Sequence, residues 1–423
     1  MKAFLVSLCT LLLTGAAPRA VAQDEGQGPE DLETVTAGRH TPLVLPEDWE
    51  NPLRQEGLSP KEAHELPFGI EAYRGSEQLG LNPGYIDGVR AGLHLMYLRD
   101  YKGVREHFAA LDERFPNTGI SAVADTLVWQ VLMLENFDYK YDSQYWVTTR
   151  RAREELEAAL EIPGSEGWEH FLMAGVVGIE SIHTMRQERY LPALQLALDA
   201  MAEAGKAKEA APGFTDLLLA DGMYNYWRTV VTQNSRMLPD FGDLRMEGLE
   251  QMRTVESEGV FLGPPASLAL AFSYIEEHKL KAALSACARN ARPYPDNIIN
   301  NLLLGQVQTY MRRYTPAMAS FDRILAVAPN NKRVRYWRGV TLLRSGRSPE
   351  AEQELLTYLA FDYLEDHQRA GGHYRLGQAY YRQKRYPEAV TEFKKAVKQS
   401  GHKGAKASLD RMKRLRREGR IDF

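Results

Sequence analysis

Apolar residues recur at spacings of three and four over most of the chain, from about residue 85 to residue 415. This spacing places them on one face of an α-helix, so the pattern predicts a series of amphipathic helices with one buried face each. The clearest pair occupies residues 370–401, with a turn at 384–387 between its two helices. Further pairs are predicted at 120–136 with 145–162, at 168–186 with 190–204, and at 215–230 with 246–255.

Small residues recur in register with these helices. Two series of small residues are spaced by the same two intervals. One series is Gly305, Gly339 and Gly377, and the other is Ala317, Ala351 and Ala389. The first interval in each series is 34 residues and the second is 38. A fixed period of this length is typical of repeat proteins built from stacked supersecondary units.

Residues 370–401 resemble a tetratricopeptide repeat, a unit of two helices and 34 residues. The matching positions are Leu376, Gly377 and Tyr380 in the first helix, and Ala389, Phe393 and Ala396 in the second. Units at 264–297, 298–331, 332–365 and 85–117 follow the same frame less regularly. The resemblance implies an all-α, right-handed α-solenoid of about eight helical hairpins. At residues 405–417, Leu409, Met412 and Leu415 fall on one helix face, which predicts a C-terminal capping helix over the last repeat.

The N-terminal part of the chain has a different composition. Residues 1–22 have the form of a secretory signal peptide, with Lys2, an apolar run at 3–13, and small residues at Ala20 and Ala22. Residues 23–69 hold eleven Asp and Glu against three Lys and Arg, and they predict a disordered acidic lead-in. We therefore expect an exported, periplasmic or secreted protein, in which degenerate repeats at 70–259 precede regular repeats at 260–401 and a basic cap and tail at 402–423.

The composition and motifs favour no catalytic chemistry. The chain lacks a P-loop, a GxGxxG after a strand, a GxSxG and an HExxH motif. Glu180 and His183 have the i, i+3 spacing of a helical metal pair, but such sites need a second pair. Cys287 is the only cysteine left once residues 1–22 are removed, so we expect a small core residue and no intramolecular disulfide. No enzyme activity, metal or cofactor is expected.

The first helix of each tetratricopeptide unit lines the concave surface, which defines the candidate partner-binding positions. In this frame they are Gln306, Tyr310, Arg333, Tyr336, Arg344, Tyr374, Gln378, Tyr381 and Arg382. The set is aromatic, amide and cationic, without an acid, and it suits a partner protein or peptide that is acidic and carries apolar anchors. The alternative is a solvated polar groove with no peptide ligand.

A second candidate interface is the aromatic loop region at 137–146. Its residues are Phe137, Tyr139, Tyr141, Tyr145 and Trp146, mixed with Asp138 and Asp142. Aromatic side chains anchor many protein interfaces. The alternative is that they pack the loop onto its own helices.

Taken together, the pattern predicts a non-enzymatic protein-interaction scaffold of the bacterial cell envelope. Two other functions stay open, namely a structural subunit of an envelope machine for secretion, motility or outer-membrane assembly, and an accessory factor that binds a solute or glycan. Nucleic acid is not an expected partner of this chain of 423 residues. The basic stretch at 394–423 is too short by itself to indicate one, and an exported protein rarely meets nucleic acid.

Overall fold

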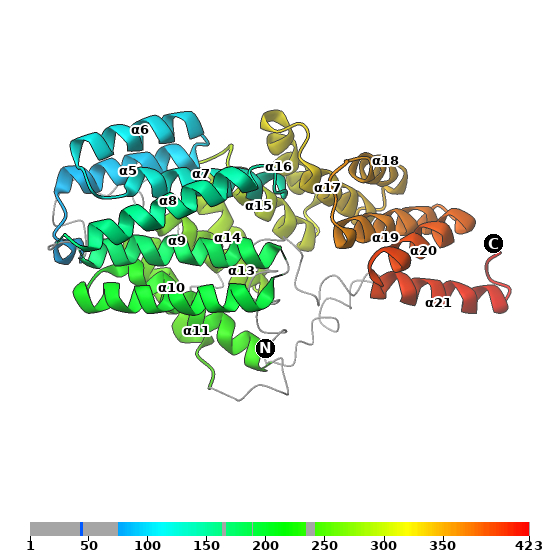
Figure 1. Cartoon of the computed structure of the whole chain (residues 1–423). Coiled ribbons are helices and arrows are strands. Elements are labelled where there is room, and N and C mark those ends of the chain that lie inside the picture. The colour runs from blue at the N-terminus through cyan, green and yellow to red at the C-terminus, as the bar shows by residue number, and fades with distance from the viewer. Residues whose placement is uncertain (1–42, 45–74, 163–165, 188, 234–241, 423) are drawn as a thin grey trace. The chain divides into compact units, whose positions relative to one another are not determined.

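The computed structural model describes residues 43–44, 75–162, 166–187, 189–233 and 242–422 (Figure 1). Within these ranges all regular secondary structure is helical. The predicted signal peptide at 1–22, and the lead-in at 23–69 apart from residues 43 and 44, lie outside the described residues. The described chain forms two compact units, the first from residues up to 135 and 139–300, and the second from residues 136–138 and 301–422.

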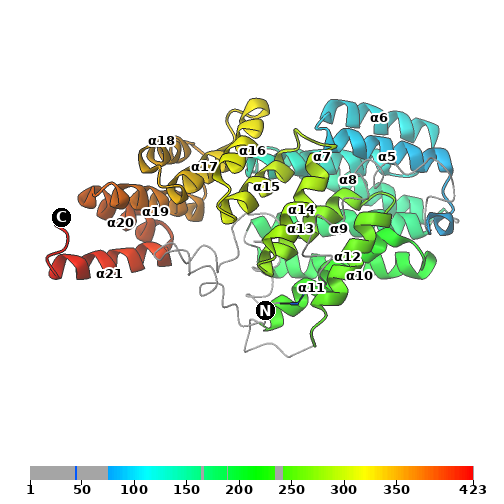
Figure 2. The same cartoon turned by 180° about the vertical axis from the view of Figure 1, so that it is seen from behind.

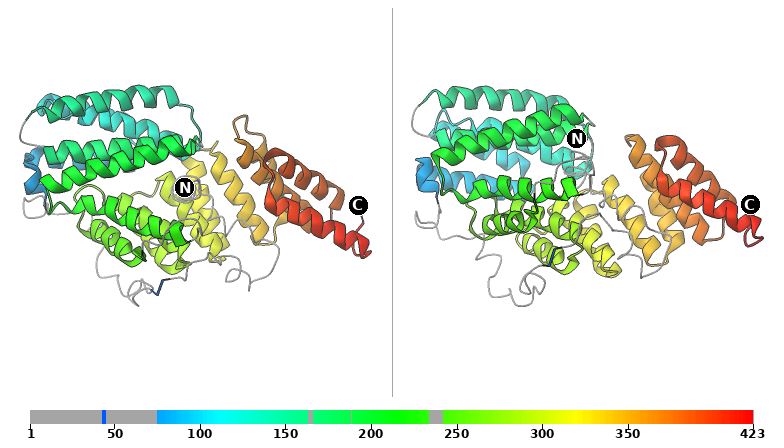
Figure 3. Two further views of the ribbon diagram at one scale, coloured as in Figure 1. Left: turned by 60° about the horizontal axis from the view of Figure 1, so that its bottom comes forward. Right: turned by 90° about the horizontal axis from the view of Figure 1, so that it is seen from below.

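The first unit contains ten α-helices in the described ranges. They are α5 (Pro83–Tyr97), α6 (Tyr101–Arg114), α7 (Ile120–Asn136), α8 (Asp142–Leu160), α9 (Glu166–Arg186), α10 (Tyr190–Ala210), α11 (Leu218–Gln233), α12 (Arg245–Glu258), α13 (Gly263–Glu276) and α14 (Leu280–Ala291), with short 3-10 turns η4 (Ser76–Leu79) and η5 (Thr215–Leu217). The long helices α8, α9 and α10 lie side by side (Figures 1 and 3).

The second unit contains the last seven α-helices. They are α15 (Ile298–Tyr310), which begins at the boundary, α16 (Tyr314–Val327), α17 (Lys332–Arg344), α18 (Ser348–Leu359), α19 (Asp366–Arg382), α20 (Tyr386–Ser400) and α21 (Lys403–Arg417). Helices α17 and α18 pack as a hairpin, α19 and α20 pack as the next, and α21 packs against α20 (Figure 2). Over the described residues, the predicted all-α fold of about eight hairpins followed by a capping helix is therefore confirmed.

Among the turns that the structure describes in full, five hairpins share one turn, which explains their common geometry. The second of three linking residues has a positive φ in each turn, at Arg99, His278, Arg312, Gly346 and Lys384. In each case the backbone N–H of the next residue donates to the carbonyl five residues earlier, as Arg385 does to Tyr380 at 2.9 Å. This left-handed C-terminal cap satisfies the last carbonyls of one helix and aims the chain into the next.

The glycine series lies where the two helices of a hairpin come closest. A Cβ at Gly377 would lie 2.7 Å from the Phe393 ring, and one at Gly305 would lie 2.4 Å from the Phe321 ring. Gly339 faces Leu355 in the same way. In all three pairs the large residue follows the glycine by 16 positions. Each glycine thus makes room for a buried side chain of its own hairpin, as the repeat pattern predicts.

Several predicted helix bounds differ from the structure by one to six residues, among them both ends of α11, the start of α9 and the end of α12. Helix α8 begins at Asp142, where residue 145 is predicted, and α10 continues to Ala210, where residue 204 is predicted. The reason for the second difference is local, because Gly205 is exposed with open space around it and the helix formers that follow can continue the helix. The predicted change of repeat regularity at residue 260 is distinct from the packing division at residue 300, and it stays a prediction.

Three further sequence expectations concern burial and membranes. Cys287 is 1% exposed, as expected for a core residue, and burial raises the pKa of its thiol to about 12. In α21, Met412 and Leu415 are buried and Leu409 packs beside the core, as a capping helix requires. Among the described residues no helix combines the length and the apolar character needed to cross a membrane.

Candidate protein-binding surfaces

The nine predicted partner-binding residues all lie on the first helices of the second unit's hairpins, namely α15, α17 and α19. Four of them are buried, and these are Gln306, Tyr310, Tyr374 and Gln378. Arg333, Tyr336, Arg344 and Tyr381 are half-buried, and Arg382 is exposed. The buried members therefore hold the accessible ones in place, and binding of a partner by this set stays a prediction.

Contacts between α15 and α17 join the first part of this set. The Arg344 guanidinium lies 5.6 Å from the centroid of the Tyr310 ring, a cation–π arrangement. Tyr310 also meets Trp337 edge to face, with ring centroids 5.9 Å apart. The aromatic side chains thus fix the position of Arg344 on the helix surface.

Contacts between α17 and α19 depend on Arg375, a residue that the sequence analysis missed. Its Nε donates to the Tyr336 hydroxyl at 3.3 Å, and its Nη1 donates to Gln378 Oε1 at 3.1 Å. Gln378 Nε2 in turn donates to the Tyr374 hydroxyl at 3.0 Å. A signal for Arg375 was available, because positions 375, 378 and 382 have the spacing of one helix face.

The arginines of this surface lie close enough to affect one another. Burial, and then the charge of Arg382, lower the pKa of Arg375 to about 9. Burial, and then the charge of Arg344, lower the pKa of Arg382. Burial and the charge of Arg375 lower the pKa of His402 to about 4. At neutral pH the arginines are therefore charged and His402 is neutral. Because Arg375 is buried, the cations crowd at this surface and just beneath it. We call this surface the arginine–tyrosine face and define it as Tyr310, Tyr336, Arg344, Tyr374, Arg375, Tyr381 and Arg382.

The aromatic residues at 137–146 pack mainly around buried side chains. Tyr145 is fully buried and its ring lies 4.2 Å from that of His183, while Tyr139 and Trp146 meet the same imidazole edge to face. Tyr141 packs against Trp129 at 5.1 Å. Phe137, which belongs to the second unit, lies under the guanidinium of Arg333 at 4.7 Å. These contacts match the alternative of loop packing, and the role of the cluster as an interface stays a prediction.

The residues weighed as a metal pair have other contacts. Glu180 accepts a hydrogen bond from Arg153 at 2.8 Å. His183 Nε2 lies 2.6 Å from Asp142 Oδ1, and its Nδ1 faces the Gln130 amide at 3.1 Å. Burial lowers the pKa of His183 to about 4, although Asp142 opposes the shift. The neutral imidazole therefore joins α7, α8 and α9 as a structural residue.

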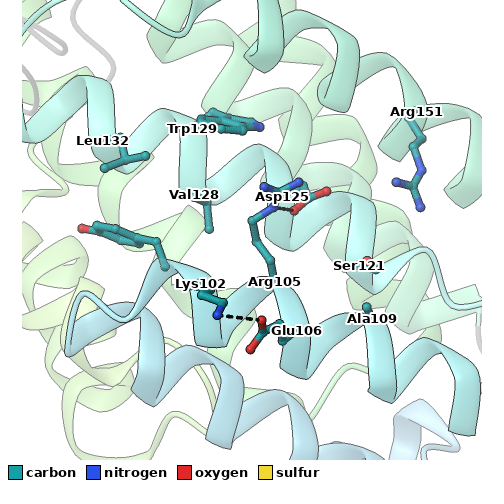
Figure 4. Close-up of a pocket in the computed structure, with 11 residues that line it drawn as sticks. Lys102, Arg105, Glu106, Ala109, Ser121, Asp125, Val128, Trp129, Leu132 and Arg151 are labelled. Carbon is teal, nitrogen blue, oxygen red and sulfur yellow. Dashed lines mark hydrogen bonds and ion pairs between the residues drawn. The ribbon is translucent and has the colours of Figure 1, made fainter.

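An open groove of about 680 Å³ lies in the first unit, where the sequence analysis named no site (Figure 4). Its lining residues come from α6, α7 and α8, and they are Tyr101, Lys102, Arg105, Glu106, Ala109, Ser121, Asp125, Val128, Trp129, Leu132 and Arg151. Arg105 pairs with Asp125 at 2.7 Å and lies 5.4 Å from the Trp129 ring. The half-buried Trp129 beside paired charges offers a place for an apolar anchor. The charged residues of this groove are both cations and acids, whereas those of the arginine–tyrosine face are all cations.

Comparison with known proteins supports the repeats of the second unit. Two family models described as tetratricopeptide repeat match residues 302–363 and 370–402, so this part of the chain consists of tetratricopeptide repeats. No curated protein matches the chain significantly. Among solved structures, the crystal structure of the P58(IPK) TPR domain aligns with 80% of this chain and 100% of that domain, at 12% identity and a TM-score of 0.27. A likeness this weak supports no conclusion about the fold or the function of this chain.

Proposed function

We propose that the chain is a non-enzymatic protein-interaction scaffold of the bacterial cell envelope, and that its arginine–tyrosine face binds an acidic segment of a partner protein. Tetratricopeptide repeats typically present an extended surface for protein binding. The observation that carries the proposal is the crowding of Arg344, Arg375 and Arg382 among tyrosines on successive first helices.

The chemistry of this face suits carboxylates with apolar neighbours. Like charges that crowd together raise one another's energy, and a carboxylate placed between them relieves that repulsion. A guanidinium also binds a carboxylate through two parallel hydrogen bonds. Half-buried Tyr336 and Tyr381 add apolar area with a polar tip, which suits an aliphatic or aromatic anchor on the partner.

The envelope location rests on the N-terminal sequence. The signal-peptide pattern at 1–22 supports export, and cleavage after Ala22 leaves Gln23 as the first residue. N-terminal sequencing of the protein recovered from the periplasm or medium is expected to begin at or near Gln23. A cytoplasmic protein that retains Met1 would count against export and leave the binding proposal standing.

The binding site is tested by charge reversal on the face. We expect the double variant Arg344→Glu, Arg382→Glu to lose partners that the wild type captures from an envelope extract at low salt. Raised salt is expected to release the same partners from the wild type, because screening weakens the attraction. The matched control is Arg312→Glu, Arg323→Glu, which removes the same charge from exposed positions of the second unit outside the face. Equal capture by both variants would exclude this face as the site.

The acidic lead-in at 23–69 gives a second readout. Its eleven acids make it a competitor for a cationic surface of the same chain. Deletion of residues 23–69 is therefore expected to tighten binding of the partner in the wild type. The same deletion in the double variant should have no effect, because the surface for which both segments compete has lost its charge.

A further inference from the structure

Helix α21 carries a dense row of cations on its solvent side. Five exposed cations lie on one side of the helix, as their spacing requires, and they are Lys403, Lys406, Lys413, Arg414 and Arg417. We call these five residues the basic face. Helix α21 itself lies at the end of the second unit, beside α20 (Figures 1 and 2).

The opposite side of α21 fixes the orientation of this face. Ala405, Met412 and Leu415 are buried against the rest of the second unit. The helix start is also fixed, because the His402 ring accepts a hydrogen bond from the backbone N–H of Ala405 at 3.2 Å. Since α21 is packed on one side and capped, its cations are held outward in a fixed row.

Neighbouring acids offset only part of this charge. Between residues 403 and 422 there are eight Lys and Arg against three acids, whereas the whole chain has a net charge of −4. Asp410 lies 3.7 Å from Lys413, and Glu418 lies 4.0 Å from Arg414. Pairs at these distances on an exposed surface are weak. The five exposed cations of the basic face therefore present most of their charge to solvent.

We propose that the basic face docks the protein onto an anionic phospholipid bilayer. Clusters of four to eight Lys and Arg on an amphipathic helix are typical of binding to anionic lipids. A protein partner is less well matched, because protein interfaces have apolar centres and few lysines. No large hydrophobic side chain of α20 or α21 is exposed in the described structure. The lipid surface needs only charge, which is what this face offers.

This inference is independent of the proposed protein-binding function, since the two surfaces use different residues. The arginine–tyrosine face lies on α15, α17 and α19, and the basic face lies on α21. A scaffold with both surfaces would hold its partner at the membrane. Failure of either surface in its own test leaves the other unaffected.

The test is sedimentation of the whole mature chain with vesicles of phosphatidylcholine, with and without phosphatidylglycerol. We expect binding only to vesicles that contain phosphatidylglycerol, and we expect high salt to abolish it. The quadruple variant Lys403→Glu, Lys406→Glu, Lys413→Glu, Arg417→Glu is expected to bind these vesicles weaker by on the order of a hundredfold or more.

The matched control reverses four other exposed cations and has the same net charge. It carries Lys281→Glu, Arg312→Glu, Arg323→Glu and Lys384→Glu, and it is expected to bind like the wild type. Helix content by circular dichroism verifies folding, and a version of the first variant with Gln in place of Glu covers a failure to fold. Equal loss in both quadruple variants, no binding to anionic vesicles, or binding only to an acidic protein or to DNA would overturn the proposal.

Discussion

At the scale of single residues, this fold depends on positions where a side chain is absent. Gly377 and Gly305 face the rings of Phe393 and Phe321 at distances that leave no room for a Cβ. Elsewhere a helical glycine has no such role, since open space surrounds a Cβ at Gly175 of α9. The same residue type is thus required by packing at some positions and neutral at others.

The first prediction compares these two kinds of glycine. Gly377→Ala is expected to destabilise the protein by about 1–3 kcal/mol, because the new methyl group overpacks the hairpin. Gly175→Ala is expected to stabilise it by roughly 0.5–1 kcal/mol, because alanine favours a helix interior. Urea denaturation of both variants measures the difference. Equal effects of the same sign would contradict the proposed packing.

The second prediction concerns the turn inside each hairpin. Lys384 has a φ of 61° and Gly346 has a φ of 84° at the equivalent position. A left-handed conformation costs a non-glycine residue about 1–2 kcal/mol. Glycine avoids this cost, but the greater flexibility of glycine in the unfolded state offsets part of the gain in stability. We therefore expect Lys384→Gly to raise the free energy of unfolding by roughly 0.5–1 kcal/mol, and Gly346→Ala to lower it. Thermal melts of the two variants should shift in opposite directions.

At the scale of helices, some elements are completed by residues far away in the sequence. Helix α13 begins after Leu262, whose side chain provides no cap. Buried Asp216 of η5 accepts hydrogen bonds from the backbone N–H groups of Val260, Phe261 and Leu262, at 2.7, 2.8 and 2.7 Å. The carboxylate of one turn thus satisfies the backbone donors of the three residues that lead into another helix.

The third prediction is that Asp216→Ala destabilises the first unit strongly. Three buried N–H groups lose their acceptor, and each unsatisfied donor costs about 1–3 kcal/mol. We expect a loss of about 3 kcal/mol or more by urea denaturation. Asp216→Asn keeps one acceptor oxygen and is expected to lose less. No loss of stability in Asp216→Asn would show that the side chain at this position only fills space.

The fourth prediction concerns pH and His183, which joins α7, α8 and α9. Its folded pKa of about 4 lies below the ordinary value of 6.5, so between these values the unfolded state binds more protons. Stability due to this residue is therefore complete above pH 6.5 and falls as the pH drops toward about 4, by at most about 1.4 kcal/mol per pH unit.

Other buried groups act in the same range, so the measurement needs a reference variant. Burial raises the pKa of Asp216 to about 6 and that of Glu276 to about 7, and these shifts have the opposite effect on stability. Asp216 and Glu276 contribute equally in the wild type and in His183→Gln, so their contributions cancel in the difference in unfolding free energy between the two proteins. That difference should shrink as the pH falls from 6.5 to 4, and a constant difference would contradict a neutral buried His183.

At the scale of the whole molecule, stability is expected to be local. In a repeat protein each hairpin mainly contacts its neighbours, so damage stays near its origin. The fifth prediction is that Gly377→Ala accelerates amide hydrogen exchange in α19, α20 and α21 and leaves exchange in α5 and α6 unchanged. Equal acceleration around Gly92 and Gly377 would mean that the two compact units unfold together.

The amino-acid sequence by itself determined the helices, their pairing and the place of the cap. These features are local, because spacings of three and four define a buried face, and Gly305, Gly339 and Gly377 each meet a side chain 16 residues later. The apolar residues of α21 likewise identified it as the cap before the structure placed Met412 and Leu415 in the core.

Only the tertiary structure decided which side chains meet across helices that are distant in sequence. It brought Arg375 to Tyr336, Asp216 to the start of α13, and His183 among Tyr139, Tyr145 and Asp142. It also formed the groove beside Trp129 from three helices. The physical reason is that periodicity fixes which face of a helix is buried, whereas the residue opposite depends on the register and crossing of helices, which no local pattern encodes.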